Sequence, residues 1–388
     1  MNPRQFFLQT NTFYGYGITR NIEYLLKTNK FEDVVILVDE GVKNKSEYFP
    51  EIEKIISAVA HSLQAVVLRG TEEPDYDYLD TVVEKIRKFN RVDVLIGIGG
   101  GSCLDITKAA AVLKTNPGKG IEYRGFDKVQ KPGIPTIAVP TTAGTGSEVT
   151  VNAVFTDKVE MKKLGINGRY MNATFAILDA EWTMSCPTAV AVSSGMDALV
   201  HTLESFMCNQ STPLTRAFSR EAFKNLYEAL PSLVEDAENK VRRQQLLLGS
   251  YLAGIALFNS GSGIAGAMSY PLGVHFKIPH GIGGGIFISS VLEYNVKKGY
   301  LDYAQLYDLV EKGNELESEE KNWRFVRMIQ DVADKLNVPQ TLNAWGINRS
   351  NLAEVVSLML PLQPAFDQNP IPFSAEVDAR EMLEQHII

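Results

Sequence analysis

Residues 93–108, DVLIGIGGGSCLDITK, join a strand pattern to a helix pattern. Asp93 to Ile98 form a short apolar run that is typical of a buried strand. The run ends in Gly99-Gly100-Gly101-Ser102, and a helix-like segment starts at Cys103. Backbone amides at such a strand-to-helix turn can bind a phosphate, and glycine lets the ligand approach closely. The spacing is not G-x-G-x-x-G, so a plain tight turn stays the alternative.

The sequence around this stretch alternates in the same way. Amphipathic segments, one ending near Ala60 and one covering 76–89, separate the apolar runs. The predicted strands are 33–39, 64–69, 93–98, 134–139 and 176–179. This order predicts a parallel sheet covered by helices, which is a Rossmann-like α/β domain.

The pattern changes near Pro187, after which strand-like runs become scarce. Helical periodicity covers 189–207, 215–233, 242–258 and 322–336. The length of 388 residues favours more than one domain. We therefore expect an α/β dinucleotide-binding domain over 1–185 and an all-helical domain over 186–388.

Composition narrows the class of protein. Hydrophobic residues make up 45% and charged residues 22%, and the formal net charge is -8, so we expect neither a nucleic-acid nor a membrane partner. The first residues lack the order of a signal peptide, which predicts a cytoplasmic protein. Cys103, Cys186 and Cys208 are too few for a disulfide framework and are expected to be buried as small apolar residues.

Two further segments fit a bound dinucleotide. The loop after the strand 134–139 reads PTTAGTGSE, and its hydroxyl groups could bond a pyrophosphate, a ribose or a nicotinamide amide. Asp39 ends an earlier strand, where a carboxylate can accept hydrogen bonds from an adenosine ribose and repel a 2′-phosphate. That position predicts NAD rather than NADP, although a solvated turn residue is an equal alternative.

The second half contains a candidate metal site. Asp197 and His201 are four residues apart on a predicted helix, so both project from one face. With His280 they would supply one carboxylate and two imidazoles, a three-ligand set that leaves a coordination position open for catalysis. A divalent ion, iron or zinc, is the expected cofactor.

Together these motifs resemble the iron-containing (group III) alcohol dehydrogenase family, which is related in fold to glycerol dehydrogenase and dehydroquinate synthase. The resemblance covers nearly the whole chain. It rests on four motifs in the expected order, which are Gly99–Ser102 with Asp105 and Lys108, the 140–148 loop, Gly195-Met196-Asp197-Ala198 with His201, and Pro271-Leu272-Gly273 followed by Pro279-His280-Gly281. It implies a dehydroquinate synthase-like fold, with metal and nicotinamide meeting between an α/β domain and a helical domain.

The resemblance also implies roles for individual residues. Asn152 and Leu257 fall at substrate-pocket positions, and a lysine important for conformation falls at Lys163. The implied cofactor-binding residues are Asp39, Gly99, Gly100, Gly101, Ser102, Asp105, Thr141, Thr142, Thr145, Ser147, Lys163 and Leu178.

The chain departs from the family where many members read His-x-x-x-His-Pro-Leu-Gly. Gly266 stands in place of the first histidine, a metal ligand, and Tyr270 in place of the second, which is credited with proton relay. Weaker metal binding is expected, and Gly266→His is expected to tighten it. His275 is a candidate substitute ligand or relay, and a surface residue is the alternative.

Tyr270 also resembles the sugar-acid 8-oxidase branch of the family. Further likeness to that branch lies in Glu72-Glu73-Pro74, Thr115-Asn116-Pro117-Gly118, Tyr123-Arg124-Gly125 and Lys163-Leu164-Gly165. That enzyme keeps the histidine that Gly266 replaces, so the likeness favours a carbohydrate-type substrate without fixing it.

The sequence thus predicts an NAD-dependent, metal-assisted alcohol dehydrogenase acting on a small alcohol or aldehyde of polyol, diol or sugar type. Asp197, His201, His280, Tyr270 and His275 are the candidate catalytic residues. A homodimer or larger homo-oligomer is expected. Two alternatives stay open, a dehydroquinate synthase-like lyase with transient NAD redox and a catalytically degenerate dinucleotide-binding protein.

Overall fold

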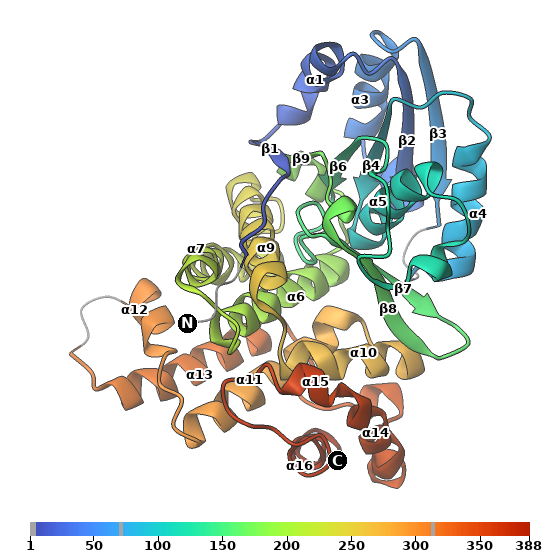
Figure 1. Cartoon of the computed structure of the whole chain (residues 1–388). Coiled ribbons are helices and arrows are strands. Elements are labelled where there is room, and N and C mark those ends of the chain that lie inside the picture. Colours follow the sequence, from blue (N-terminus) through green and yellow to red (C-terminus); the bar gives the residue numbers. More distant parts are fainter. Residues whose placement is uncertain (1–4, 70–72, 312–314) are drawn as a thin grey trace. The chain divides into compact units, whose positions relative to one another are not determined.

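A computed structural model describes residues 5–69, 73–311 and 315–388 (Figure 1). These residues group into two compact units. The sheet unit contains 7–187 and 238–247, and the helical unit contains 5–6, 188–237 and 248–388. The short segment 238–247 groups with the first half of the chain, which the sequence did not indicate. The predicted division into folding domains at residue 185 stays a prediction, and Glu72 lies outside the described residues.

A six-stranded sheet forms the centre of the sheet unit, with strand order β1-β9-β6-β4-β2-β3. Every neighbouring pair is parallel, which confirms the predicted α/β class. The strands are β1 Asn11–Tyr14, β2 Asp33–Asp39, β3 Ser62–Leu68, β4 Val94–Gly99, β6 Thr136–Pro140 and β9 Phe175–Leu178. Val38 pairs with Ile98 and Gly99 pairs with Pro140, so β2, β4 and β6 end at the same edge.

Helices cover both faces of this sheet (Figure 1). The helices of the unit include α1 Ile22–Asn29, α2 Glu40–Lys45, α3 Tyr48–Ser57, α4 Tyr76–Arg87 and α5 Gly101–Thr115. Because successive strand residues point to opposite faces, Val35 and Leu37 of β2 pack in the core with α4 and α5, whereas Val34 and Ile36 pack with α1 and α3. The sheet is therefore buried on both sides, as its apolar strands require.

A second, three-stranded sheet was not predicted. Its order is β5-β8-β7, with β5 Gly125–Phe126, β7 Asn152–Asp157 and β8 Lys162–Asn167. β7 and β8 form an antiparallel hairpin. This hairpin carries Asn152 and Lys163, two residues to which the resemblance gives functional roles.

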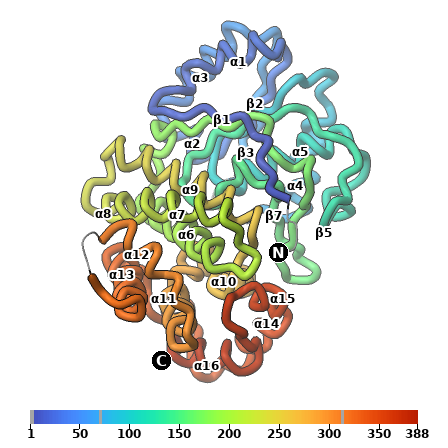
Figure 2. Tube along the Cα trace, turned by 60° about the vertical axis from the view of Figure 1, so that its left-hand side comes forward, coloured from blue at the N-terminus to red at the C-terminus, as the bar shows by residue number. Residues whose placement is uncertain are grey.

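Within its described residues the helical unit contains helices and no strand, which agrees with the predicted pattern. Its helices are α6 Thr188–Met207, α7 Pro213–Ala229, α8 Ser232–Glu235, most of α9 Lys240–Ser260, α10 Ile264–Phe276, α11 His280–Lys297, α12 Ala304–Val310, α13 Ser318–Lys335, α14 Leu352–Met359, α15 Gln363–Phe366 and α16 Asp378–His386. α6, α10 and α11 pack on one another, and they build the candidate site (Figure 2).

In the described part of the chain, no single helix is long and apolar enough to cross a membrane. The pair α9 and α10, bent by 100° at their junction, passes that test jointly by length and composition. Much of α10, including Ile264 and Met268, is buried inside the protein. Cys103 and Cys208 are buried as expected, and Cys186 is half-buried.

Candidate metal centre and cofactor loops

α6 carries two of the predicted metal ligands on its buried face. Asp197 and His201 lie one turn apart, and both are buried. The Nε2 atom of His201 lies 3.5 Å from Oδ1 of Asp197. The four-residue spacing in the sequence therefore produces the expected side-by-side placement.

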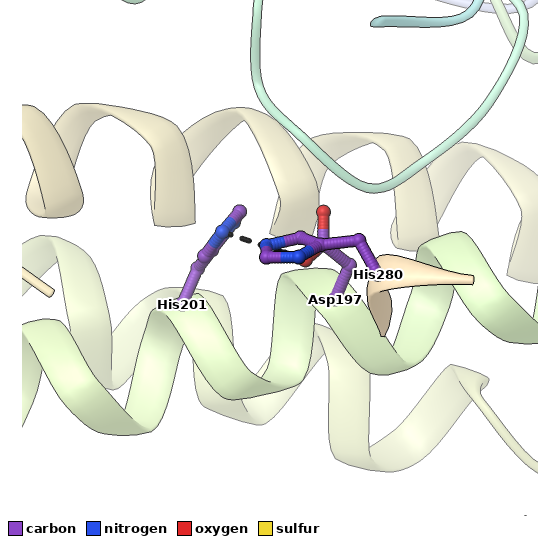
Figure 3. Close-up of side chains that lie close together, drawn as sticks. All are labelled: Asp197, His201 and His280. Carbon is purple, nitrogen blue, oxygen red and sulfur yellow. Dashed lines mark ion pairs between the residues drawn. The ribbon is translucent and has the colours of Figure 1, made fainter. Parts of the chain in front are cut away.

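His280 reaches the same place from α11, of which it is the first residue. A Cβ atom on Gly281 would lie 1.8 Å from the carbonyl oxygen of Ser193 and 2.9 Å from Cβ of Asp197. Only glycine allows α11 to start this close to α6. As a result, Nε2 of His280 lies 3.6 Å from Oδ1 of Asp197 (Figure 3).

The three side chains fit a divalent ion. Each offers one ligand atom, and these atoms all lie within 4.8 Å of one another. Around a tetrahedral ion with ligand distances of about 2.1 Å, neighbouring ligand atoms lie about 3.4 Å apart, close to the separations from Asp197. One carboxylate and two imidazoles form a donor set that iron and zinc both accept. Among the described residues, no other group of this kind occurs.

Tyr270 and His275, both on α10, differ in their relation to this group. The ring of Tyr270 packs on the ring of His280, with centroids 4.6 Å apart. His275 is exposed in the last turn of α10 and is not part of the group. The structure thus does not bring His275 among the metal ligands, which corrects its suggested role as a substitute ligand, and a relay role for His275 stays a prediction.

Gly266 faces a carboxylate that sequence reasoning missed. Glu204, on α6 one turn after His201, is fully buried. It accepts hydrogen bonds of 2.9 Å from the amides of Gly263 and Gly266 at the start of α10. A Cβ atom on Gly266 would lie 2.8 Å from its Oε2. The space beside Gly266 is therefore filled by Glu204, and the expectation that a histidine there would complete the metal site does not fit the structure.

The predicted cofactor loops meet at one edge of the large sheet. Gly100 precedes α5 without a side-chain cap, so the first amides of α5 are not bonded by a capping side chain. A Cβ atom on Gly101 would lie 2.6 Å from Oγ1 of Thr145, so the two loops touch here. The amide of Thr141 donates to the carbonyl of Gly99. Backbone amides and threonine hydroxyls are thus gathered as a phosphate site requires.

Asp39 lies at the same sheet edge, at the end of β2. Its carboxylate accepts hydrogen bonds from the amides of Gly41 and Val42 and so caps α2. The residue is only half-buried. Both hydrogen bonds go to Oδ1, so capping α2 does not use the second carboxylate oxygen, Oδ2, as an acceptor.

Two other motif residues, Lys108 and Asp105, hold the 140–148 loop and the residues after it in place. Lys108 is buried, and its ammonium donates to the carbonyl oxygens of Ser147, Thr150 and Asn152. Asp105 accepts from the hydroxyl of Ser147 and the amide of Val154. Burial lowers the pKa of Lys108. These contacts are structural, and cofactor contacts by Asp105 and Ser147 stay a prediction.

The remaining predicted residues are spread over both units. The carbonyl of Leu178 accepts from Gln244 and Gly15, and Lys163 forms an ion pair with Glu73. Ser102 is exposed at the start of α5. Leu257 is half-buried on α9 in the helical unit. Their roles stay predictions.

Comparison with known proteins gives consistent matches. A family model described as iron-containing alcohol dehydrogenase matches residues 9–180, and the model of the C-terminal part of that family matches residues 191–385. The chain is 32% identical over 298 residues to long-chain-alcohol dehydrogenase 1 of Geobacillus thermodenitrificans, covering 76% of this chain and 75% of the relative. It is 30% identical over 368 residues to sulfoacetaldehyde reductase of Bilophila wadsworthia, covering 92% of each.

Solved structures show the same fold. A crystal structure of 1,3-propanediol oxidoreductase matches with a TM-score of 0.91 and 22% identity, covering 100% of both chains. Sulfoacetaldehyde reductase from Bifidobacterium kashiwanohense, solved in complex with NAD+, matches with a TM-score of 0.87 and 24% identity, covering 99% of this chain and 98% of that one.

Proposed function

Because the chain belongs to the iron-containing alcohol dehydrogenase family, we propose that it is an NAD-dependent, metal-assisted oxidoreductase that interconverts a small alcohol with its carbonyl compound. The observation that carries the proposal is the group formed by the buried Asp197 and His201 and the half-buried His280, whose ligand atoms lie within 4.8 Å of one another. The relatives support it, since their names describe the oxidation of alcohols and the reduction of sulfoacetaldehyde.

The proposal assigns metal binding to the helical unit. Asp197 would supply the negative charge, and His201 and His280 would each present Nε2, since these nitrogens face the carboxylate. When bound, the ion would polarise the alcohol oxygen and the nicotinamide would take up the hydride. Tyr270, packed on His280, is the protein group proposed to move the alcohol proton.

The proposal assigns cofactor binding to the sheet unit. The amides at Gly100 and Gly101 and the hydroxyls of Thr142 and Thr145 would hold the pyrophosphate, because they converge where β4 ends and α5 begins. Asp39 would accept hydrogen bonds from the adenosine ribose. A polyol, diol or sugar-type substrate, iron or zinc as the metal, a homo-oligomeric assembly and a cytoplasmic location stay predictions.

The test is to purify the protein, quantify the bound metals, and screen alcohols and aldehydes while following NADH absorbance. We expect about one divalent ion per chain and NAD-linked turnover of at least one alcohol. Bound metal with turnover of a phosphorylated substrate and no net NADH would indicate the lyase instead. Absence of both metal and turnover would indicate a degenerate dinucleotide-binding protein.

A further inference from the structure

Ser269 connects the metal site to α10. It is fully buried on that helix, one turn after Gly266. Its hydroxyl lies 2.6 Å from the carbonyl oxygen of Gly266 and 2.5 Å from Nδ1 of His280. The residue lies within the 266–273 stretch, at a position to which the family pattern gives no role.

The protons of this chain of hydrogen bonds can be assigned from the groups themselves. A carbonyl oxygen can only accept, so the single hydroxyl proton of Ser269 is donated to Gly266. The hydroxyl oxygen must then accept from His280, which requires a proton on Nδ1. In a neutral imidazole the other nitrogen, Nε2, then carries the lone pair. That nitrogen is the one that faces Asp197.

We propose that Ser269 is a positioning residue that fixes the tautomer of His280 and so keeps Nε2 ready to bind the metal. The inference rests on the metal site of the proposed function. It concerns a residue that is not one of the three metal ligands. A partner on the outer nitrogen of a ligating histidine is a general means of fixing ring orientation and tautomer.

Packing holds the Ser269 hydroxyl in this position. A Cβ atom on Gly283 would lie 2.9 Å from Cβ of Ser269, so α11 lies directly against this residue. His280 and Gly283 belong to the same first turn of α11. The close contact of α10 and α11 therefore brings the hydroxyl of Ser269 next to the His280 side chain.

His201, the other imidazole of the site, differs from His280 at Nδ1. Its Nδ1 atom is buried and has no hydrogen-bond partner in the described part of the chain. Among the described residues, no hydrogen-bond partner on Nδ1 selects the tautomer of His201 in the way that Ser269 selects that of His280. The two imidazoles of the site should differ in how firmly their tautomers are set.

The first experiment needs no variant of Ser269. Long-range proton–nitrogen correlation spectra of the metal-free protein, labelled with nitrogen-15 in histidine, distinguish protonation at Nδ1 from protonation at Nε2. The His280 signals are assigned by their loss in His280→Asn. We expect the neutral form of His280 to be protonated at Nδ1. Protonation at Nε2, or a mixture of both tautomers, would overturn the inference.

The second experiment compares Ser269→Ala with Ser289→Ala in chelator competition for Zn²⁺. Ser289 is a buried serine of α11 whose hydroxyl has no partner among the described residues, so it is a matched control. We expect Ser269→Ala to weaken Zn²⁺ binding by 10- to 100-fold, the usual effect of losing such a partner. We expect Ser289→Ala to bind like the unmodified protein. Equal affinity in all three proteins would contradict the inference.

The two proposals fail in different ways. If the unmodified protein binds no divalent ion while His280 is protonated at Nδ1, the metal assignment fails and the assignment of the tautomer holds. If the ion binds and the tautomer is mixed, the role of Ser269 fails and the metal site holds. The spectrum of the unmodified protein decides the matter even if Ser269→Ala does not fold.

Discussion

The amide nitrogen of Gly266 lies 2.9 Å from Oε1 of Glu204, with both residues buried. The second oxygen of the carboxylate accepts from Gly263 in the same turn. Burial raises the pKa of Glu204 to about 7, although these backbone hydrogen bonds act in the opposite direction. A side chain of α6 thus caps the start of α10 at the position where many relatives are expected to carry a metal-binding histidine.

This contact predicts that Gly266→His destabilises the protein. The new Cβ atom would lie 2.8 Å from Oε2 of Glu204, whose two oxygens are both bonded to backbone amides. We expect a loss of about 1–3 kcal/mol in the free energy of unfolding, the usual cost of overpacking. Urea unfolding measures the loss. Gly266→Ala should show much of the same loss, because Cβ alone makes the contact. A Gly266→His variant of unchanged stability that binds metal more tightly would contradict this account.

His280→Ala should abolish metal retention. It removes one of only three protein ligand atoms and leaves a carboxylate and one imidazole. Elemental analysis after dialysis measures the effect. His61→Ala is the control, because His61 is exposed in the sheet unit and should be replaceable without loss of metal. Full metal content and activity in His280→Ala would mean that the assigned site is wrong.

Asp39→Asn should narrow the preference for NAD over NADP. The charge that opposes a 2′-phosphate is lost, whereas asparagine is as good an N-cap for α2 as aspartate. We expect kcat/KM for NADP to rise relative to that for NAD, with little change in melting temperature. Asp39→Gly removes both the charge and the side-chain cap and separates the two effects. Comparable kcat/KM for the two cofactors in the unmodified enzyme would refute the premise.

Glu148→Gln should change how stability depends on pH. Glu148 is buried, its Oε1 has no partner within the described residues, and burial raises its pKa from 4.5 to about 7, with Lys108 acting in the opposite direction. A raised pKa in the folded state gives stability that is present below the unfolded pKa and is lost as pH rises through the folded pKa. The free energy of unfolding of the unmodified protein, relative to Glu148→Gln, should therefore fall between roughly pH 5 and pH 8.

Urea unfolding across this pH range, with metal-free protein, measures the slope for Glu148. Glu84→Gln is the control, since Glu84 is exposed on α4 and its replacement should leave the slope unchanged. Parallel curves for the unmodified protein and Glu148→Gln would show that the carboxyl does not titrate in this range.

Strongly periodic or strongly apolar elements could be predicted from the sequence. β2 has the predicted bounds 33–39, and α6 begins within one residue of its prediction. β1 was missed because it has four residues, most of them exposed. α11 was missed because Gly281, Gly283, Gly284 and Gly285 lower its intrinsic helix propensity, and its stability comes from tight packing against α6 and α10.

Some residues of the candidate site could likewise be predicted from the sequence, and others could not. Asp197 and His201 could be predicted as a pair, because helical spacing alone brings them together. Glu204 and Ser269 could not, because their partners lie on other helices and the contacts depend on how closely α6, α10 and α11 approach. The signal that could have pointed to this approach is the glycine-rich run after His280, which permits close helix packing.

The pairing of β1 with a late part of the chain has a consequence for folding during synthesis. β1 pairs only with β9 in the large sheet, and Asp179, just after β9, accepts hydrogen bonds from the amides of Gly17 and Thr19. A chain emerging from the ribosome thus exposes residues 11–19 long before their partners exist. Because sheet pairing over such a separation is slow and leaves strands exposed in the meantime, residues 11–19 stay unpaired in the nascent chain until the segment around Asp179 has been made.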